Sequence, residues 1–341
     1  MQEYEVVGEA PDDEGFMPDW LYDGDHAAAM SVRKKFVDLC EGKKLEDAIP
    51  GKTITVGEGE CYCIESEEDF SLRPIDREAA RKALLSSLRL LHGIGPEKEA
   101  KLRAEGYASI EDLLDHTAWK HKARKLVDLV DSCDTVRIQE ELWHWLPKSH
   151  PLNLYTTAFA GPEKLVAIDI ETMGLFSRPI FLFGLAFVEG DKIRTRQFLA
   201  RDIEEEPAAM QAFCDLLAGR PIMSYNGRAF DVPYVNQRRW YYDMPGVLDN
   251  IHFDMLHFAR RRFCDECSDA RLTTIEKHLF GEDRADDVPG AMVPEFYEHY
   301  LDTGNPGPLV PIVEHNRRDI ITLAKLFARL CEEEQSNVSD R

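Results

Sequence analysis

The stretch LVAIDIETMG, residues 165–174, decides the fold of the region around it. The apolar residues from Leu165 to Ile170, interrupted only by Asp169, predict a strand buried in a sheet. Asp169 and Glu171 lie two residues apart, so both side chains point to the same side of that strand. Two buried carboxylates repel each other unless a cation lies between them, and Mg²⁺ and Mn²⁺ prefer such oxygen ligands. For this pair alone, a solvent-exposed strand end is an equally good interpretation.

Strands and helices alternate after this stretch. Further strands are predicted within PIFLFGLAFVEG, KIRTRQFLA and PIMSYNG, and a helix is predicted at about 205–218. The remainder is predicted to be mostly helical, to about Glu332. Strands in series followed by alternating helices predict an α/β layered domain with a mixed sheet.

Two later segments add acidic residues at predicted helices. Asp231, in SYNGRAFDVPYV (224–235), begins a helix, where it is a candidate N-cap as well as a candidate ligand. VEHNRRDIITLAKLFARL (313–330) has the pattern of an amphipathic helix, and His315 and Asp319 lie on one side of it at i and i+4. Such a pair is more often a surface pair than a catalytic one, so its significance depends on the other motifs.

The segments DIET, YNGRAFD and HNRRD, in this order, resemble the three motifs of the DEDD exonucleases of the ribonuclease-H-like superfamily. The match is closest to the YprB-like branch, which LTTIEKHLFG (272–281) and PEFYEHYLDTGN (294–305) also resemble. The resemblance covers about 164–330 and implies a ribonuclease-H-like mixed sheet flanked by helices. It also implies 3′–5′ exonuclease activity with two Mg²⁺ or Mn²⁺ ions, one for the attacking hydroxide and one for the leaving oxygen.

The resemblance also assigns roles to single residues. His315 is the implied general base, although its His-x3-Asp spacing departs from the Tyr-x3-Asp and His-x4-Asp of the two DEDD subgroups. Asn226 and Arg228 are implied to contact the nucleic acid, and Asp254 is expected to be a structural acid. Three cations either follow a phosphate backbone or form a solvated helix face: Arg260, Arg261 and Arg262. The implied metal ligands are Asp169, Glu171, Asp231 and Asp319.

A second pattern lies in LLHGIGPEKEAKLRAEGYASIEDLL (90–114). A helix is predicted to end at His92, the three residues from Gly93 to form a tight turn, and Pro96 to begin the next helix. Glycines let backbone N–H groups approach a phosphate closely. The pattern resembles a helix-hairpin-helix motif that binds nucleic-acid backbones, although such hairpins also serve only as packing or protein-binding elements. The candidate contacts are Gly93, Gly95, Lys98 and Lys101, followed by Lys120, Lys122, Arg124 and Lys125.

Charge distinguishes this second region from the rest of the chain. The 341 residues include 63 Asp and Glu against 41 Lys and Arg, a net charge of −22 that taken alone argues against a nucleic-acid partner. From Arg77 to Lys125, eleven Lys and Arg face seven Asp and Glu, a net charge of +4. A nucleic acid is therefore expected to bind there, and divalent ions to neutralise the scissile phosphate.

The length suits two domains. The absence of a long apolar run or a signal core predicts a soluble, cytoplasmic protein. Eight cysteines with only two close pairs, 61/63 and 264/267, favour free thiols over a zinc site. The expected regions are an acidic flexible N-terminus with a small β-hairpin (1–75), a helical helix-hairpin-helix domain (76–145), a linker (146–163) and the exonuclease-like domain (164–332).

The leading hypothesis is a metal-dependent 3′–5′ exonuclease that acts on DNA, with DNA repair as its setting. The alternatives are an exoribonuclease, a structure-specific endonuclease at the same site, a non-catalytic nucleic-acid-binding module, and a zinc-binding adaptor. The hairpin motif favours DNA over RNA slightly, and the presence of all four carboxylates argues against a module without catalysis. Protein partners are not indicated by the sequence.

Overall fold

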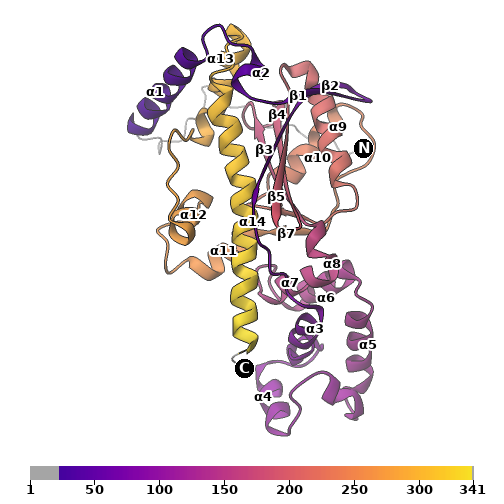
Figure 1. Cartoon of the computed structure of the whole chain (residues 1–341). Coiled ribbons are helices and arrows are strands. Elements are labelled where there is room, and N and C mark those ends of the chain that lie inside the picture. Colours follow the sequence, from indigo (N-terminus) through magenta and orange to yellow (C-terminus); the bar gives the residue numbers. More distant parts are fainter. Residues whose placement is uncertain (1–22, 340–341) are drawn as a thin grey trace, which may run out of the picture.

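The computed structural model describes residues 23–339, which form a seven-stranded mixed sheet packed among helices (Figure 1). The strand order is β1-β2-β5-β4-β3-β6-β7. Neighbours are antiparallel from β1 to β3, whereas β3, β6 and β7 are parallel. This architecture confirms the predicted α/β fold. The strands are β1 (Lys52–Val56), β2 (Gly59–Asp69), β3 (Val166–Thr172), β4 (Ile180–Glu189), β5 (Lys192–Leu199), β6 (Ile222–Ser224) and β7 (His252–Asp254).

Helices flank the sheet, and the longest of them, α14, crosses one face in Figure 1. None of the helices within 23–339 is both long and apolar enough to span a lipid bilayer. The helices around the sheet are α1 (Asp23–Leu39), α2 (Leu45–Ala48), α9 (Glu206–Leu217), α10 (Asp231–Tyr241), α11 (Met255–Phe263), α12 (Leu272–Phe280), α13 (Val293–Thr303) and α14 (Leu309–Ser339).

Strand β3 lies inside the sheet and divides its side chains between two cores. Val166 and Ile168 belong to the core that includes α9 and the first turns of α14, whereas Ala167 belongs to the core that includes α14 from Ile320 onward. Side chains alternate along a strand, so Asp169 and Glu171 share the side of Ala167. Both carboxylates therefore face α14, the helix on which the sequence places the third motif.

A helical region lies beyond one end of the sheet in Figure 1, with α4 at its far end. It has a hydrophobic core of its own, which runs from Leu84 to Leu142 in the sequence. Asp76 caps the first helix, because its carboxylate accepts hydrogen bonds from the N–H groups of Glu78 and Ala79. The helices are α3 (Arg77–Leu85), α4 (Pro96–Ala104), α5 (Lys120–Asp131), α6 (Thr135–Trp145), α7 (Leu152–Tyr155) and α8 (Thr157–Ala160).

The structure differs from the sequence-based expectation at several elements. The helix expected to end at His92 ends at Leu85, where the Ser86 hydroxyl donates to the carbonyl of Lys82, and a 3₁₀ turn follows at Leu88–Leu90. The expected hairpin forms, but β2 pairs with β5 and so extends the sheet. The region called flexible lies partly outside the described residues, and α1 already begins at Asp23. The linker contains α7 and α8, and the domain boundaries stay a prediction.

Candidate active site

Strand β3 and helix α14 position the first carboxylate. Asn316 of α14 donates from Nδ2 to Asp169 Oδ2 at 2.8 Å, and it is itself held by Gln197 Nε2, which donates to Asn316 Oδ1 at 2.9 Å. Across the antiparallel pair, Asp169 lies opposite Gly184 of β4. A Cβ atom at Gly184 would lie 2.2 Å from Asn316 Oδ1, so the buried amide occupies the space that a side chain would need. A glycine therefore permits the contact that orients Asp169.

A tight turn between β6 and α10 delivers Asp231. Asp254, at the end of β7, accepts from the N–H groups of Asn226 at 2.9 Å and Arg228 at 3.1 Å. Asn226 has a φ of 68°, and this left-handed conformation lets the chain reverse into the helix. Asp231 is the first residue of α10 and is buried, whereas Phe230 occupies the N-cap position. Asp254 thus organises the turn, in agreement with its expected structural role.

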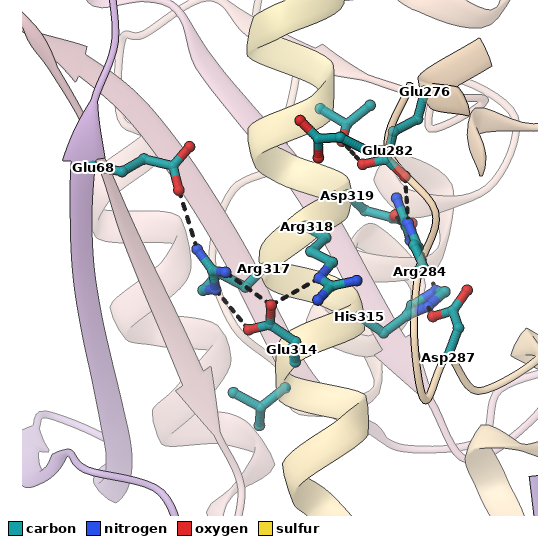
Figure 2. Close-up of polar contacts among 12 residues, drawn as sticks. Glu68, Glu276, Glu282, Arg284, Asp287, Glu314, His315, Arg317, Arg318 and Asp319 are labelled. Atoms are coloured by element: carbon teal, nitrogen blue, oxygen red, sulfur yellow. Dashed lines mark hydrogen bonds and ion pairs between the residues drawn. The ribbon is translucent and has the colours of Figure 1, made fainter. Parts of the chain in front are cut away.

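Helix α14 adds His315 and Asp319, and the loop after α12 lies beside them (Figure 2). His315 Nδ1 lies 2.6 Å from Asp287 Oδ1, and its Nε2 lies 3.6 Å from Asp319 Oδ2. The other oxygen of Asp319, Oδ1, forms a 2.6 Å ion pair with Arg284 Nη1. Arg284 also donates from Nε to Glu276 Oε2 at 2.5 Å, and both of these side chains are almost completely buried. Arg284 therefore fixes one oxygen of Asp319.

The carboxylates interact strongly because they are close and buried. Burial, and then the charges of Glu171, Asp319 and Asp231, raise the pKa of Asp169 well above its usual value. Burial is also the first cause that raises the pKa of Glu171 and that of Asp231 to about 7 each. Without a metal, the folded site therefore retains protons near neutral pH.

His315 is protonated at neutral pH in the metal-free chain. Burial opposes its charge, but the hydrogen bond to Asp287 and the charges of Asp319 and Glu171 outweigh burial and raise its pKa to about 9. An imidazolium donates hydrogen bonds and cannot accept a proton. A role as general base requires its pKa to fall, and cations bound to the neighbouring carboxylates would cause such a fall.

The donor chemistry of the four carboxylates fits hard divalent ions such as Mg²⁺ and Mn²⁺. The mutual repulsion that raises their pKa values is what bound cations would relieve. Among residues 23–339, however, no three His, Cys, Asp or Glu side chains are already arranged around a point that would hold an ion. Metal binding is therefore expected to draw the carboxylates together.

Stability of the metal-free protein should fall as pH rises. Glu171 and Asp231 titrate at about 4.5 and 3.8 in model compounds and near 7 in the fold, so the folded state binds more protons between these values. The loss should be on the order of a few kcal/mol, complete above about pH 7. The pKa of His315 is raised from 6.5 to about 9, so this residue also reduces the stability of the fold as pH rises between those two values. Urea unfolding in EDTA from pH 5 to 9 measures the effect.

The matched control is Glu171→Gln, which removes one of these titrations. Its unfolding free energy should decline less steeply with pH than that of the wild type, because the amide carries no charge at any pH. Equal slopes for the two proteins would contradict the assigned shift.

The structure brings five predicted residues to one site and separates others from it. Asp169, Glu171, Asp231, His315 and Asp319 influence one another electrostatically. The hairpin residues lie in the helical region, away from the carboxylates (Figure 1). There, Lys98 Nζ donates to the carbonyl of Gly93, Gly95 is the N-cap of α4, and Lys101 lies 3.8 Å from Glu105.

Sequence reasoning missed the supporting residues Asn316, Arg284, Asp287 and Glu276. Glu276 lies in a segment that resembles the YprB-like branch, and Asn316 lies inside the third motif. Both residues therefore lie in segments singled out from the sequence, but no role was predicted for either. A buried acid within an apolar helical pattern was the available signal for Glu276. The partners of Asn316 are 147 and 119 residues away, and Arg284 pairs with Asp319 of a different element, so no local pattern identifies these contacts.

Comparison with known proteins shows what this part of the chain is similar to. Residues 166–331 match a family model described as the RNase_H superfamily. The uncharacterized protein YprB of Bacillus subtilis (strain 168) is 31% identical over 194 residues, which are 55% of this chain and 46% of that protein. The chain thus matches about half the length of this relative.

Among solved structures, the family B DNA polymerase of the hyperthermophilic archaeon Pyrobaculum calidifontis is similar over 47% of this chain and 24% of that chain, at 18% identity and a TM-score of 0.38. The matched family model suggests nuclease activity. Nucleases of this kind generally use divalent metal ions. The DEDD type and the helix-hairpin-helix motif stay predictions.

Proposed function

We propose that this chain is a 3′–5′ exonuclease of the DEDD type that hydrolyses phosphodiester bonds of DNA with two Mg²⁺ or Mn²⁺ ions. The observation that carries the proposal is the convergence of four carboxylates from β3, α10 and α14. Glu171, Asp231 and Asp319 each raise the pKa of Asp169, although they come from three separate elements. When bound, the ions would supply a hydroxide nucleophile and stabilise the leaving oxygen.

The residues of the chain have separable tasks in this proposal. The four carboxylates would hold the ions, and Asn316 orients Asp169 toward them. His315 would direct Nε2 toward the attacking water, because Asp287 holds its other ring nitrogen. Asn226 is exposed at the tip of its turn, where it would contact the terminal nucleotide. The turn at Gly93–Gly95 would bind the strand backbone farther away.

Cleavage of 5′-labelled oligonucleotides tests the proposal. Single-stranded and duplex DNA and the matching RNA are incubated with Mg²⁺, Mn²⁺ or EDTA. A ladder that shortens from the 3′ end of DNA and disappears in EDTA is the expected result. Preference for RNA would make the chain an exoribonuclease, and one internal cut would make it an endonuclease. Binding without any cleavage would contradict catalysis altogether.

Reversing two charges of the hairpin should weaken binding without slowing the chemistry. In Lys98→Glu with Lys101→Glu, repulsion of the phosphates should lower affinity for DNA about tenfold or more at low salt. The single-turnover rate at saturating substrate should not change, because α4 is remote from the carboxylates (Figure 1). Fluorescence anisotropy and rapid quench measure the two quantities.

Lys43→Glu with Lys44→Glu is the matched control. These lysines are also exposed and adjacent on the chain, but they lie in the loop before α2, away from the helical region. Equal losses of affinity in the two double variants would indicate a general charge effect and remove the case for the hairpin.

A further inference from the structure

Two cations contact the ring of one tryptophan, where the helical region lies against the part of the chain that contains the sheet. Trp143 lies near the end of α6, and Lys148 Nζ lies 4.8 Å from the centroid of its ring. Arg228 Cζ lies 5.0 Å from the same ring, although it comes from the turn that leads to Asp231. We call these three residues the Trp143 cation site. Attraction between each cation and the indole holds both charges in place.

No acidic side chain forms an ion pair with either cation in the part of the chain that the structure describes. No carboxylate oxygen of the described residues lies within 4.0 Å of a side-chain nitrogen of Lys148 or Arg228, whereas Arg284 pairs with Asp319 and Arg238 pairs with Glu206. Burial lowers the pKa of Arg228, and the charge of Asp254 offsets this only in part. Burial, and then the charge of Arg228, lower the pKa of Lys148, which shows that the two cations repel each other.

Of the other polar groups at the site, the Asp254 carboxylate has its hydrogen-bond partners, but one nitrogen of Arg228 does not. Asp254 is the nearby acid, but both of its oxygens already accept backbone N–H groups, from Asn226, Arg228 and Leu256. Arg228 donates from Nη2 to the carbonyl of His252, while its buried Nε has no hydrogen-bond partner. Two repelling cations and a free buried donor are the arrangement that an anion would complete.

The size of the site selects the kind of anion. The recess between Trp143, Arg228 and His252 has a volume of about 10 Å³, enough for a group no larger than a water molecule. A nucleobase does not fit there, but one phosphate oxygen does, with the rest of the phosphate outside against the exposed Lys148. Arginine suits this contact, because its planar fork matches the geometry of phosphate.

We infer that the Trp143 cation site binds one backbone phosphate of a nucleic-acid strand and so joins the helical region to the strand that enters the carboxylate site. The inference rests on the proposed function for its substrate class. Arg228 lies three residues before Asp231, so a phosphate held here is close to the reacting end of the strand. A phosphate bound by both parts of the chain would also fix the direction in which the strand leaves toward the helical region.

The test measures the salt dependence of binding with the full chain in EDTA, where no cleavage occurs. The probes are 5′-fluorescein-labelled 20-nucleotide single strands of DNA and RNA, followed by anisotropy from 25 to 200 mM NaCl. The variants are Arg228→Gln, Lys148→Gln and the double variant. Arg220→Gln is the matched control, because Arg220 is also stacked on an aromatic ring, 5.7 Å from the centroid of Phe187. Lys148 is exposed, so its variant does not endanger folding.

Each single variant should lose about three- to tenfold in affinity at 50 mM NaCl, and Arg220→Gln should lose nothing. The slope of log K against log salt should fall by about 0.7 in magnitude, the value for one phosphate of a single strand. The double variant should lose little more slope than either single variant, since both cations hold the same phosphate. A wild-type slope in the double variant, or an equal loss in Arg220→Gln, would overturn the inference.

Cleavage assays on the same proteins separate this inference from the proposed function. If the slopes change as expected but the wild type cuts nothing, the phosphate site stands and the nuclease proposal fails. If the wild type cuts and the double variant binds as the wild type does, the phosphate site fails alone. A wild type that binds neither probe refutes the phosphate site as well.

Discussion

Asp169→Asn should abolish metal-dependent cleavage while making the metal-free protein more stable. The variant loses one metal ligand, and a fall in kcat of at least about 10³-fold, or about 4 kcal/mol, is expected. The free energy of unfolding should increase, because the substitution removes the repulsion between Asp169 and the carboxylates of Glu171, Asp231 and Asp319. The gain should grow with pH, since the wild-type carboxyl group loses its proton as pH rises and the amide has none to lose. Single-turnover cleavage and urea unfolding in EDTA measure the two effects.

Metal titration sharpens the same experiment. Mg²⁺ or Mn²⁺ should raise the melting temperature of the wild type, because a ligand that binds only the folded state stabilises it. The variant should respond much less. Asp191→Asn, in the exposed turn between β4 and β5, is the control and should behave as the wild type does. Undiminished cleavage by Asp169→Asn would refute the proposed site, even if its stability increased.

Gly184→Ala should damage the site from the neighbouring strand. The new methyl group would lie 2.2 Å from Asn316 Oδ1, and Asn316 is completely buried, so the amide must move. Its hydrogen bonds to Gln197 and Asp169 would then break. Overpacking of a core typically costs about 1–3 kcal/mol, and the lost hydrogen bonds add to this. Cleavage should fall at least about tenfold, because Asp169 loses the group that orients it.

A double-mutant cycle isolates the cause. If the methyl group acts only through Asn316, then Asn316→Ala with Gly184→Ala should be no less stable than Asn316→Ala alone. Gly57→Ala, in the turn between β1 and β2, is the control for the loss of a glycine, since its Cβ would meet no atom within 4 Å. Additive losses in the cycle would mean that the methyl group disturbs something other than Asn316.

The sequence was sufficient for the parts of the site that local patterns encode. The two-residue spacing in β3 predicts that Asp169 and Glu171 share a face, and the i, i+4 spacing in α14 predicts the same for His315 and Asp319. The structure has each pair on one face of its element. Both patterns depend only on neighbours within a few residues. The strand β7 was missed because its three residues include a single apolar side chain, that of Phe253, and so show no strand pattern.

The supporting contacts could not be predicted in this way. Asn316 and Asp169 are 147 residues apart, and Asn226 receives its support from Asp254, 28 residues later. The early end of α3 depends on one serine hydroxyl that competes with the helix backbone. For Asn316 and Asn226 the deciding partner is fixed by the tertiary packing, which a single sequence does not display, whereas the serine hydroxyl acts on a carbonyl only four residues away.

The separation between Asp169 and Asn316 also has a consequence for synthesis on the ribosome. At 5–20 residues per second, the 147 residues between them take between about 7 and 30 s to translate. During that interval β3 has no α14 beside it, and the carboxylates of β3 have neither Asn316 nor Asp319. The nascent chain therefore exposes an unfinished carboxylate site, and the proposed hydrolysis could begin only after α14 has docked.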